Sequence, residues 1–120
     1  MERGFTLAEA RELMPAVLAH ADQLVEVRAR LVEVQTALAG GQPSEFGGLP
    51  EAKAYQAQVS ELATWFTSHG LELKGIAPVL LDFPSQRDGQ PVLLCWLEGE
   101  RELGWYHKPE HGFAGRRRLG

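Results

Sequence analysis

The residues of this chain that are most able to do chemistry lie in its last third. Asp82 interrupts an apolar run, His107 and His111 follow with three residues between them, and Glu110 directly precedes His111. Carboxylate oxygens and imidazole nitrogens are ligands of Zn²⁺, Mn²⁺ and Fe²⁺. One interpretation is therefore a site for a divalent transition metal ion, built from Asp82 and His107 with His111 or Glu110.

The same residues also have a purely structural interpretation. A carboxylate among apolar residues is costly unless it has a partner, so Asp82 would pair with Arg116 or with backbone amides. His107 would then be a hydrogen-bonded residue at the end of a strand. Pro109 and Gly112 argue against a helix here, and a helix is where the H-x-x-x-H spacing binds metal well. Both interpretations remain open from the sequence.

The segment "GFAGR" at 112–116 suggests an anion site. Gly112 and Gly115 permit positive φ on either side of Phe113, which frees backbone amides, and Arg116 adds a fork of donors for a carboxylate or phosphate. The alternative is a tail held by Phe113 in an apolar slot, with Arg116 paired to Asp82 or Asp88. No G-K-[ST] follows, so the segment is not a P-loop.

Aromatic residues near these groups could line a pocket for a flat ligand. Alternation in a strand places Trp105 on one face with His107, and it places Trp96 with Val92 and Leu94. Cys95 has no obvious base beside it, and the pattern predicts a buried, inert thiol. The predicted ligand-binding residues are Asp82, Asp88, Trp96, Trp105, His107, Gly112, Phe113, Gly115 and Arg116.

Composition bounds the class of protein. The chain has 120 residues, a net charge of −4 and a single cysteine. The acidic balance makes nucleic acid an improbable partner, even with three arginines at 116–118. One cysteine forms no internal disulfide, and no apolar run is long enough to span a bilayer. We expect a cytoplasmic protein that is not membrane-bound.

The first half predicts a helical hairpin over residues 6–70. Thr6 and Glu9 form a capping box, and apolar residues then recur from Leu7 to Leu38 at alternating three and four positions, as in a coiled-coil stripe. The glycine-rich stretch 40–49 predicts a flexible loop, and a shorter helix follows. The first helix should project beyond the second. Its apolar stripe would then need a partner, which predicts a homodimer.

The second half, residues 75–120, predicts a three-stranded antiparallel meander with an ordered C-terminal tail. "PVLLDF" and "PVLLCWL" are rich in β-forming residues, Asp88-Gly89 is a hairpin turn pair, and "ELGWYH" supplies a third strand. The fold class is therefore α+β, in a single domain of residues 1–120. The strands are apolar on both faces, so both faces should be covered.

Three stretches together, "FTLAEARELMP", "LLDFPSQRDGQPVLLCW" and "WYHKPEHGFAGRRRL", give the chain a resemblance to an uncharacterised prokaryotic family, a domain of unknown function. The likeness covers nearly the whole chain except the loop at 40–49. The linker of this family is often less rich in glycine and its helical part more heavily charged. The resemblance implies a small cytoplasmic protein with a helical hairpin and a β element, and it implies no reaction.

Two functional hypotheses follow from the residues. The first is a binding or assembly module that self-associates through its long helix and holds a small molecule or anion between the meander and the tail. The second is a small metal- or anion-dependent enzyme that uses Asp82, His107, His111 and Arg116. We favour the first, because no acid–base or nucleophile set stands out.

Overall fold

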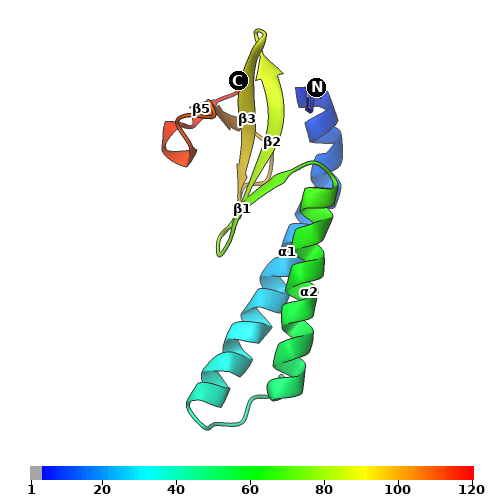
Figure 1. Cartoon of the computed structure of the whole chain (residues 1–120), viewed down its shortest axis with the longest axis vertical. Helices are drawn as coiled ribbons and strands as arrows, with labels where there is room; N and C mark the ends of the chain where they lie inside the picture. Colours follow the sequence, from blue (N-terminus) through cyan, green and yellow to red (C-terminus); the bar gives the residue numbers. More distant parts are fainter. Residues whose placement is uncertain (1–3) are drawn as a thin grey trace.

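Residues 4–120 are described by a computed structural model of the chain, which is elongated, with extents of 56 × 25 × 24 Å (Figure 1). Two helices are followed by a sheet, which confirms the α+β class. The elements in order are α1 (Leu7–Ala39), α2 (Leu49–Ser68), β1 (Glu72–Ile76), β2 (Val79–Arg87), β3 (Gln90–Leu97), β4 (Trp105–His107), the 3₁₀ turn η1 (Phe113–Gly115) and β5 (Arg117–Arg118). None of the helices within residues 4–120 is long and apolar enough to cross a membrane.

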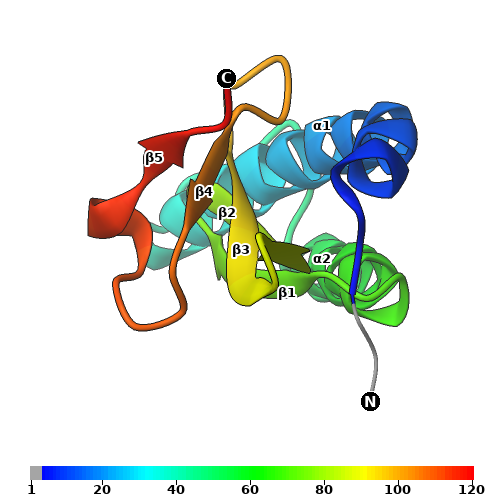
Figure 2. The same cartoon turned by 90° about the horizontal axis from the view of Figure 1, so that it is seen from above.

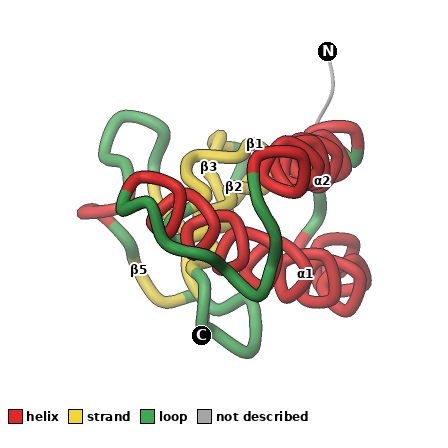
Figure 3. Tube along the Cα trace, turned by 90° about the horizontal axis from the view of Figure 1, so that it is seen from below, coloured by secondary structure: helices red, strands yellow, loops and turns green. Residues whose placement is uncertain are grey.

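The start of α1 is fixed by the predicted capping box. The amide of Glu9 donates to the Thr6 hydroxyl at 3.0 Å, and the amide of Thr6 donates to the Glu9 carboxylate at 2.8 Å. These bonds satisfy two of the amides that a helix leaves unpaired at its N-terminus. α1 and α2 then pack side by side, joined by the loop at their far end (Figure 3).

The apolar stripe of α1 is covered within the chain itself. Ala10, Met14, Val17, Ala21 and Leu24 are all buried, in one cluster with residues of the sheet. The end of α1 that extends past α2 is its N-terminal part, and the sheet lies against it (Figure 1). The expectation that this end of the stripe projects uncovered is therefore wrong. Both helices reach the hairpin tip together, where Leu38 is 45% exposed, and the homodimer stays a prediction.

The sheet is a five-stranded antiparallel meander in the order β1-β2-β3-β4-β5. It contains the three predicted strands and two edge strands that the sequence pattern did not indicate. β1 includes Gly75 at an irregularity in its pairing with β2, and β5 has only two residues. Neither presents the run of β-forming residues on which a strand prediction depends.

The two faces of the sheet have different chemistry. The inner face carries Leu81 and Phe83 of β2 and Leu94 and Trp96 of β3, which join the helices in the core. The outer face carries the alternate residues, and the segment that contains η1 and β5 lies on this side, away from the helices (Figure 2). The helices therefore cover the inner face of the sheet, and the C-terminal tail lies over its outer face. This is the cover that the apolar residues on both faces predicted.

An ion pair ties the middle of α1 to the sheet. Arg28 donates to both oxygens of the Glu98 carboxylate, at 2.7 and 3.0 Å, and also to the carbonyl of Ile76. Glu98 further accepts from the amide of Val79 at 2.9 Å. The pKa of Glu98 is lowered, first by its hydrogen bond with Arg28, and the pKa of Arg28 is raised by the same bond. The pair fixes the position of the β1–β2 turn against the helix.

Candidate metal centre

Three side chains able to bind a metal converge on the outer face of the sheet. Asp82 of β2 lies directly opposite Cys95 of β3, while His107 of β4 lies opposite Leu93, two residues from Cys95. The three are 3%, 0% and 3% exposed. One potential ligand atom of each lies within 4.8 Å of the other two. Strand register alone brings these residues together from three separate parts of the chain.

The ring of His107 lies between a backbone carbonyl and the Asp82 carboxylate. Its Nδ1 is 2.9 Å from the carbonyl oxygen of Lys108, which can only accept, so this contact is a hydrogen bond when Nδ1 carries the proton. Its Nε2 lies 3.1 and 3.2 Å from the two oxygens of the Asp82 carboxylate. A proton or a metal ion between Nε2 and the carboxylate would complete this second contact.

Cys95 is a thiol and not a nucleophile in the metal-free site. The pKa of its thiol is raised to about 12, first by burial and then by the negative charge of Asp82, which outweighs the opposing charge of Arg116. Neither nitrogen of His107 is free to take its proton, because one faces Lys108 and the other faces Asp82. The three residues therefore do not form a nucleophilic triad. A metal ion would change this, since a coordinated thiol is deprotonated.

The three converging residues differ from the predicted metal ligands in a single residue. Asp82 and His107 are brought together, as that prediction requires, but Cys95 completes the group and His111 does not. His111 is exposed and lies in the turn before η1, against Gly115. A sequence signal for Cys95 did exist. If Asp88-Gly89 is a two-residue turn, Arg87 pairs with Gln90, and counting back along both strands places Cys95 opposite Asp82.

Arg116 closes the outer face beside Cys95, but its partner is not the predicted one. Its guanidinium donates to both oxygens of Glu100, at 2.7 and 2.8 Å, and to the carbonyl of Cys95 at 3.3 Å. The pairing with Asp82 or Asp88 is therefore wrong. The guanidinium lies 4.7 Å from the ring centres of both Trp105 and Phe113, in cation–π contact with each. These contacts fix the tail over β3 and β4.

The "GFAGR" segment does not present an open anion cradle. The amide of Gly115 donates to the carbonyl of Gly112, and the amide of Arg116 donates to that of Phe113. The carboxylate of Glu100 already occupies the guanidinium of Arg116. Phe113 is 43% exposed, so it is not the buried anchor of the alternative interpretation either. Its ring supports Arg116 from the solvent side.

The two glycines of this segment differ in why they are needed. Gly112 has a φ of 66°, which favours glycine. Gly115 does not have the positive φ that the sequence suggested. A Cβ there would lie 2.4 Å from the Cβ of His111, so close packing excludes a side chain.

The remaining predicted ligand residues lie apart from the metal group or only border it. Trp105 lies opposite Cys95 on the outer face, beneath Arg116. Trp96 is buried on the inner face, and its indole nitrogen donates to the carbonyl of Glu100. Asp88 forms the β2–β3 turn with a φ of 53° and borders a separate surface groove. Trp96 and Asp88 therefore do not contact a ligand bound between Asp82, Cys95 and His107.

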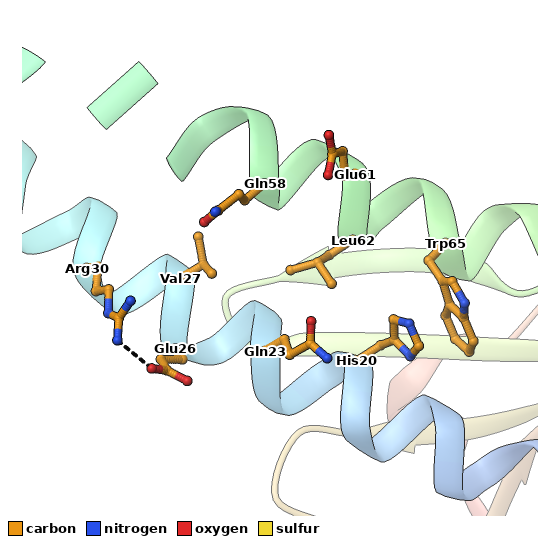
Figure 4. Close-up of a pocket in the computed structure, with 9 residues that line it drawn as sticks. All are labelled: His20, Gln23, Glu26, Val27, Arg30, Gln58, Glu61, Leu62 and Trp65. Carbon is orange, nitrogen blue, oxygen red and sulfur yellow. Dashed lines mark hydrogen bonds and ion pairs between the residues drawn. The ribbon is translucent and has the colours of Figure 1, made fainter. Parts of the chain in front are cut away.

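A second hollow lies between the two helices (Figure 4), with a volume of about 480 Å³. The ring of Trp65 stacks on the rings of His20 and His69, with distances between ring centres of 3.7 Å and 4.2 Å. Nδ1 of each histidine bonds a carbonyl of its own helix. The groove is open, and on its rim Glu26 is paired with Arg30. The stacking of Trp65 on His20 joins α1 to α2.

The fold and this site define an α+β protein, a helical hairpin on a five-stranded meander with a buried carboxylate, thiol and imidazole on the outer face. The chain belongs to the family described as "Uncharacterized conserved protein (DUF2203)", which it matches over residues 3–119. This agrees with the resemblance to a domain of unknown function. No curated protein and no solved structure matches the chain.

Proposed function

We propose that this protein is a metal-binding module that holds one divalent transition metal ion, preferably Zn²⁺, between Asp82, Cys95 and His107. The observation that carries the proposal is the convergence of three buried ligand atoms of different chemistry within 4.8 Å. Sulfur and imidazole nitrogen favour Zn²⁺ over Mg²⁺ and Ca²⁺, which prefer oxygen ligands only.

The distance between two of the three ligands already suits an ion. Zinc binds imidazole nitrogen and carboxylate oxygen at roughly 2.0–2.2 Å, so two such ligands in a tetrahedral site lie about 3.3 Å apart. The observed distances between Nε2 of His107 and the oxygens of Asp82 are 3.1 and 3.2 Å. The carbonyl of Lys108 holds the other ring nitrogen, which is the usual orienting contact of a metal-bound histidine.

Charge supports a divalent ion. A carboxylate, a thiolate and a neutral imidazole together carry two negative charges, which one divalent cation balances. Buried charge is stable only when it is compensated, so an ion of this valence suits a site with almost no exposure. We propose binding and not catalysis, because the thiol and both ring nitrogens would be engaged in holding the ion.

Metal analysis of the purified protein tests the proposal. Native mass spectrometry and elemental analysis should find one zinc ion per chain, and Cys95→Ala and His107→Gln should each lose it. His111→Ala is the matched control and should retain the full content. The melting temperature of the wild-type protein should also fall when a chelator is added, which tests the proposal even if a variant fails to fold. A wild-type chain that retains no ion under zinc-replete conditions contradicts the proposal.

A second candidate function is self-association through the partly exposed second stripe of α1. Val32 is 55% exposed, and Val25 and Leu18 lie seven and fourteen residues before it on the same stripe, half-buried at the border of the core. In an antiparallel pair of α1 helices centred on Val25, Leu18 would lie opposite Val32 of the second copy. The occupant of this face would be a second copy of the chain.

Sedimentation of the wild-type protein and of Val32→Asp tests self-association. The wild-type protein should form a dimer at micromolar concentration, and Val32→Asp should be monomeric. Leu49→Asp, which changes an equally exposed residue outside the stripe, should leave the dimer intact. A monomeric wild-type protein would remove this second function and leave metal binding unaffected.

A further inference from the structure

The proposed site leaves one coordination position unfilled by Asp82, Cys95 and His107. Zinc is almost always four-coordinate in proteins, with four protein ligands in structural sites and an open position in catalytic ones. The identity of the fourth ligand therefore decides which kind of site this is. Among the described residues, two carboxylates near the group are candidates, Glu72 and Glu100.

Glu100 is already committed. Its two oxygens accept from Arg116 at 2.7 and 2.8 Å, and one of them also accepts from the amide of Leu97 at 2.8 Å. Release of Glu100 would leave a guanidinium that is only 12% exposed without its counter-ion. Such a loss is strongly unfavourable, so Glu100 stays where it is.

Glu72 is placed differently. It lies directly opposite Asp82 across the β1–β2 ladder, so both side chains point to the outer face. It forms an ion pair with Lys74 at 2.9 Å, in which both side chains are 45% exposed. Exposed ion pairs of this kind contribute little to stability, so Glu72 can leave Lys74 at small cost. Glu72 lies one strand spacing, about 4.8 Å, from Asp82, so its carboxylate has to extend across β2 toward the ion.

We propose that Glu72 is the fourth protein ligand of the metal ion, and that Lys74 holds it aside while the site is empty. Binding of the ion takes the place of the direct contact between His107 and Asp82, releases the thiol proton of Cys95 to solvent, and moves the Glu72 carboxylate from Lys74 to the metal. Each of β1, β2, β3 and β4 then contributes one ligand to a closed, structural site. This inference depends on the proposed metal-binding function.

Zinc affinities of four variants, measured by competition with a chromogenic chelator, test the assignment. Glu72→Gln and Glu72→Asp should each weaken binding by about tenfold or more. Glu72→Asp retains the charge but shortens the side chain, so a purely electrostatic role of Glu72 would leave its affinity near that of the wild type. Lys74→Met should tighten binding in the wild-type background and have a much smaller effect in the Glu72→Gln background, because it acts by freeing Glu72.

The outcomes separate this inference from the proposed function. Zinc binding by the wild type with unchanged affinity in Glu72→Asp, or additive effects of Glu72→Gln and Lys74→Met, would overturn the role of Glu72 and leave the three-ligand site intact. A wild-type chain that binds no zinc would overturn both. The cobalt-substituted protein gives an independent readout, because loss of a protein ligand in Glu72→Gln should alter its visible spectrum.

Discussion

Two charged contacts join distant parts of this molecule, and their surroundings differ. At the edge of the sheet, Arg28 of α1 pairs with Glu98, and the side chains are 22% and 26% exposed. On the outer face, His107 of β4 pairs with Asp82 of β2, and both side chains are 4% exposed. The first pair borders solvent, and the second is almost completely enclosed.

The difference lies in how completely each pair satisfies its own atoms. Glu98 accepts from Arg28 and from the amide of Val79, and each of these donors carries its own proton. The contact of His107 with Asp82 is complete only when a proton or a metal ion lies between them, and a buried thiol stands beside it. The edge pair is complete with the protons that its donors carry, whereas the enclosed pair offers a position that a proton or a metal ion can occupy. Ligand atoms gathered at a buried position therefore identify the candidate site more clearly than charge does.

The largest expected effect is the loss of one partner of the enclosed pair. In metal-free protein, Asp82→Ala should reduce the free energy of unfolding by about 3–5 kcal/mol, because it leaves His107 buried without a counter-charge. Glu98→Ala should cost about 1 kcal/mol or less, as expected for a partly exposed pair. Urea unfolding with a chelator present measures both. Equal losses would remove the distinction between the two contacts.

Displacement of the C-terminal tail that lies over the enclosed pair should have a smaller effect. Gly115→Val should lower the free energy of unfolding by about 1–3 kcal/mol, since its Cβ would overlap His111 and displace the tail. Arg118→Ala, at an exposed neighbouring position, should change it by no more than about 0.5 kcal/mol. Thermal melts of the two variants provide the comparison. Equal melting temperatures would show that the tail does not cover the sheet tightly.

The smallest expected effect concerns the pH dependence of the edge pair. The pKa of Glu98 in the folded protein lies below its ordinary value of 4.5. Its contribution to stability is therefore present above about pH 4.5 and is lost as the pH falls through the folded value. Unfolding free energies measured from pH 6 downwards should fall less steeply in Glu98→Gln than in the wild type, by an amount set by this one group. Parallel curves would contradict the depressed pKa.

Much of the fold follows from local sequence signals. The capping box at Thr6 fixes the start of α1, the glycines of 40–49 mark the loop, and Asp88-Gly89 is the hairpin turn. The edge strands were missed because they derive their structure from their neighbours: β1 needs β2, and β5 needs β4. The burial of the α1 stripe was also missed, because periodicity identifies an apolar face but not the element that covers it.

The candidate site was predicted only in part, for a related reason. Asp82 and His107 were identified from residue type, since an acid within an apolar strand needs a partner. Cys95 was set aside because no base adjoins it in the sequence, although the turn at Asp88 fixes a register that places it opposite Asp82. The pairing of Arg116 with Glu100 depends on the path of the tail, which no local pattern specifies.

Titration of metal-free protein with Co²⁺ tests the central claim most directly, because a cobalt–thiolate bond absorbs in the near ultraviolet. We predict that the charge-transfer band appears in the wild type and saturates at one Co²⁺ per chain. It should be absent in Cys95→Ala and unchanged in His111→Ala. A wild-type titration without this band, or a band that survives the loss of Cys95, would contradict a metal centre on the outer face.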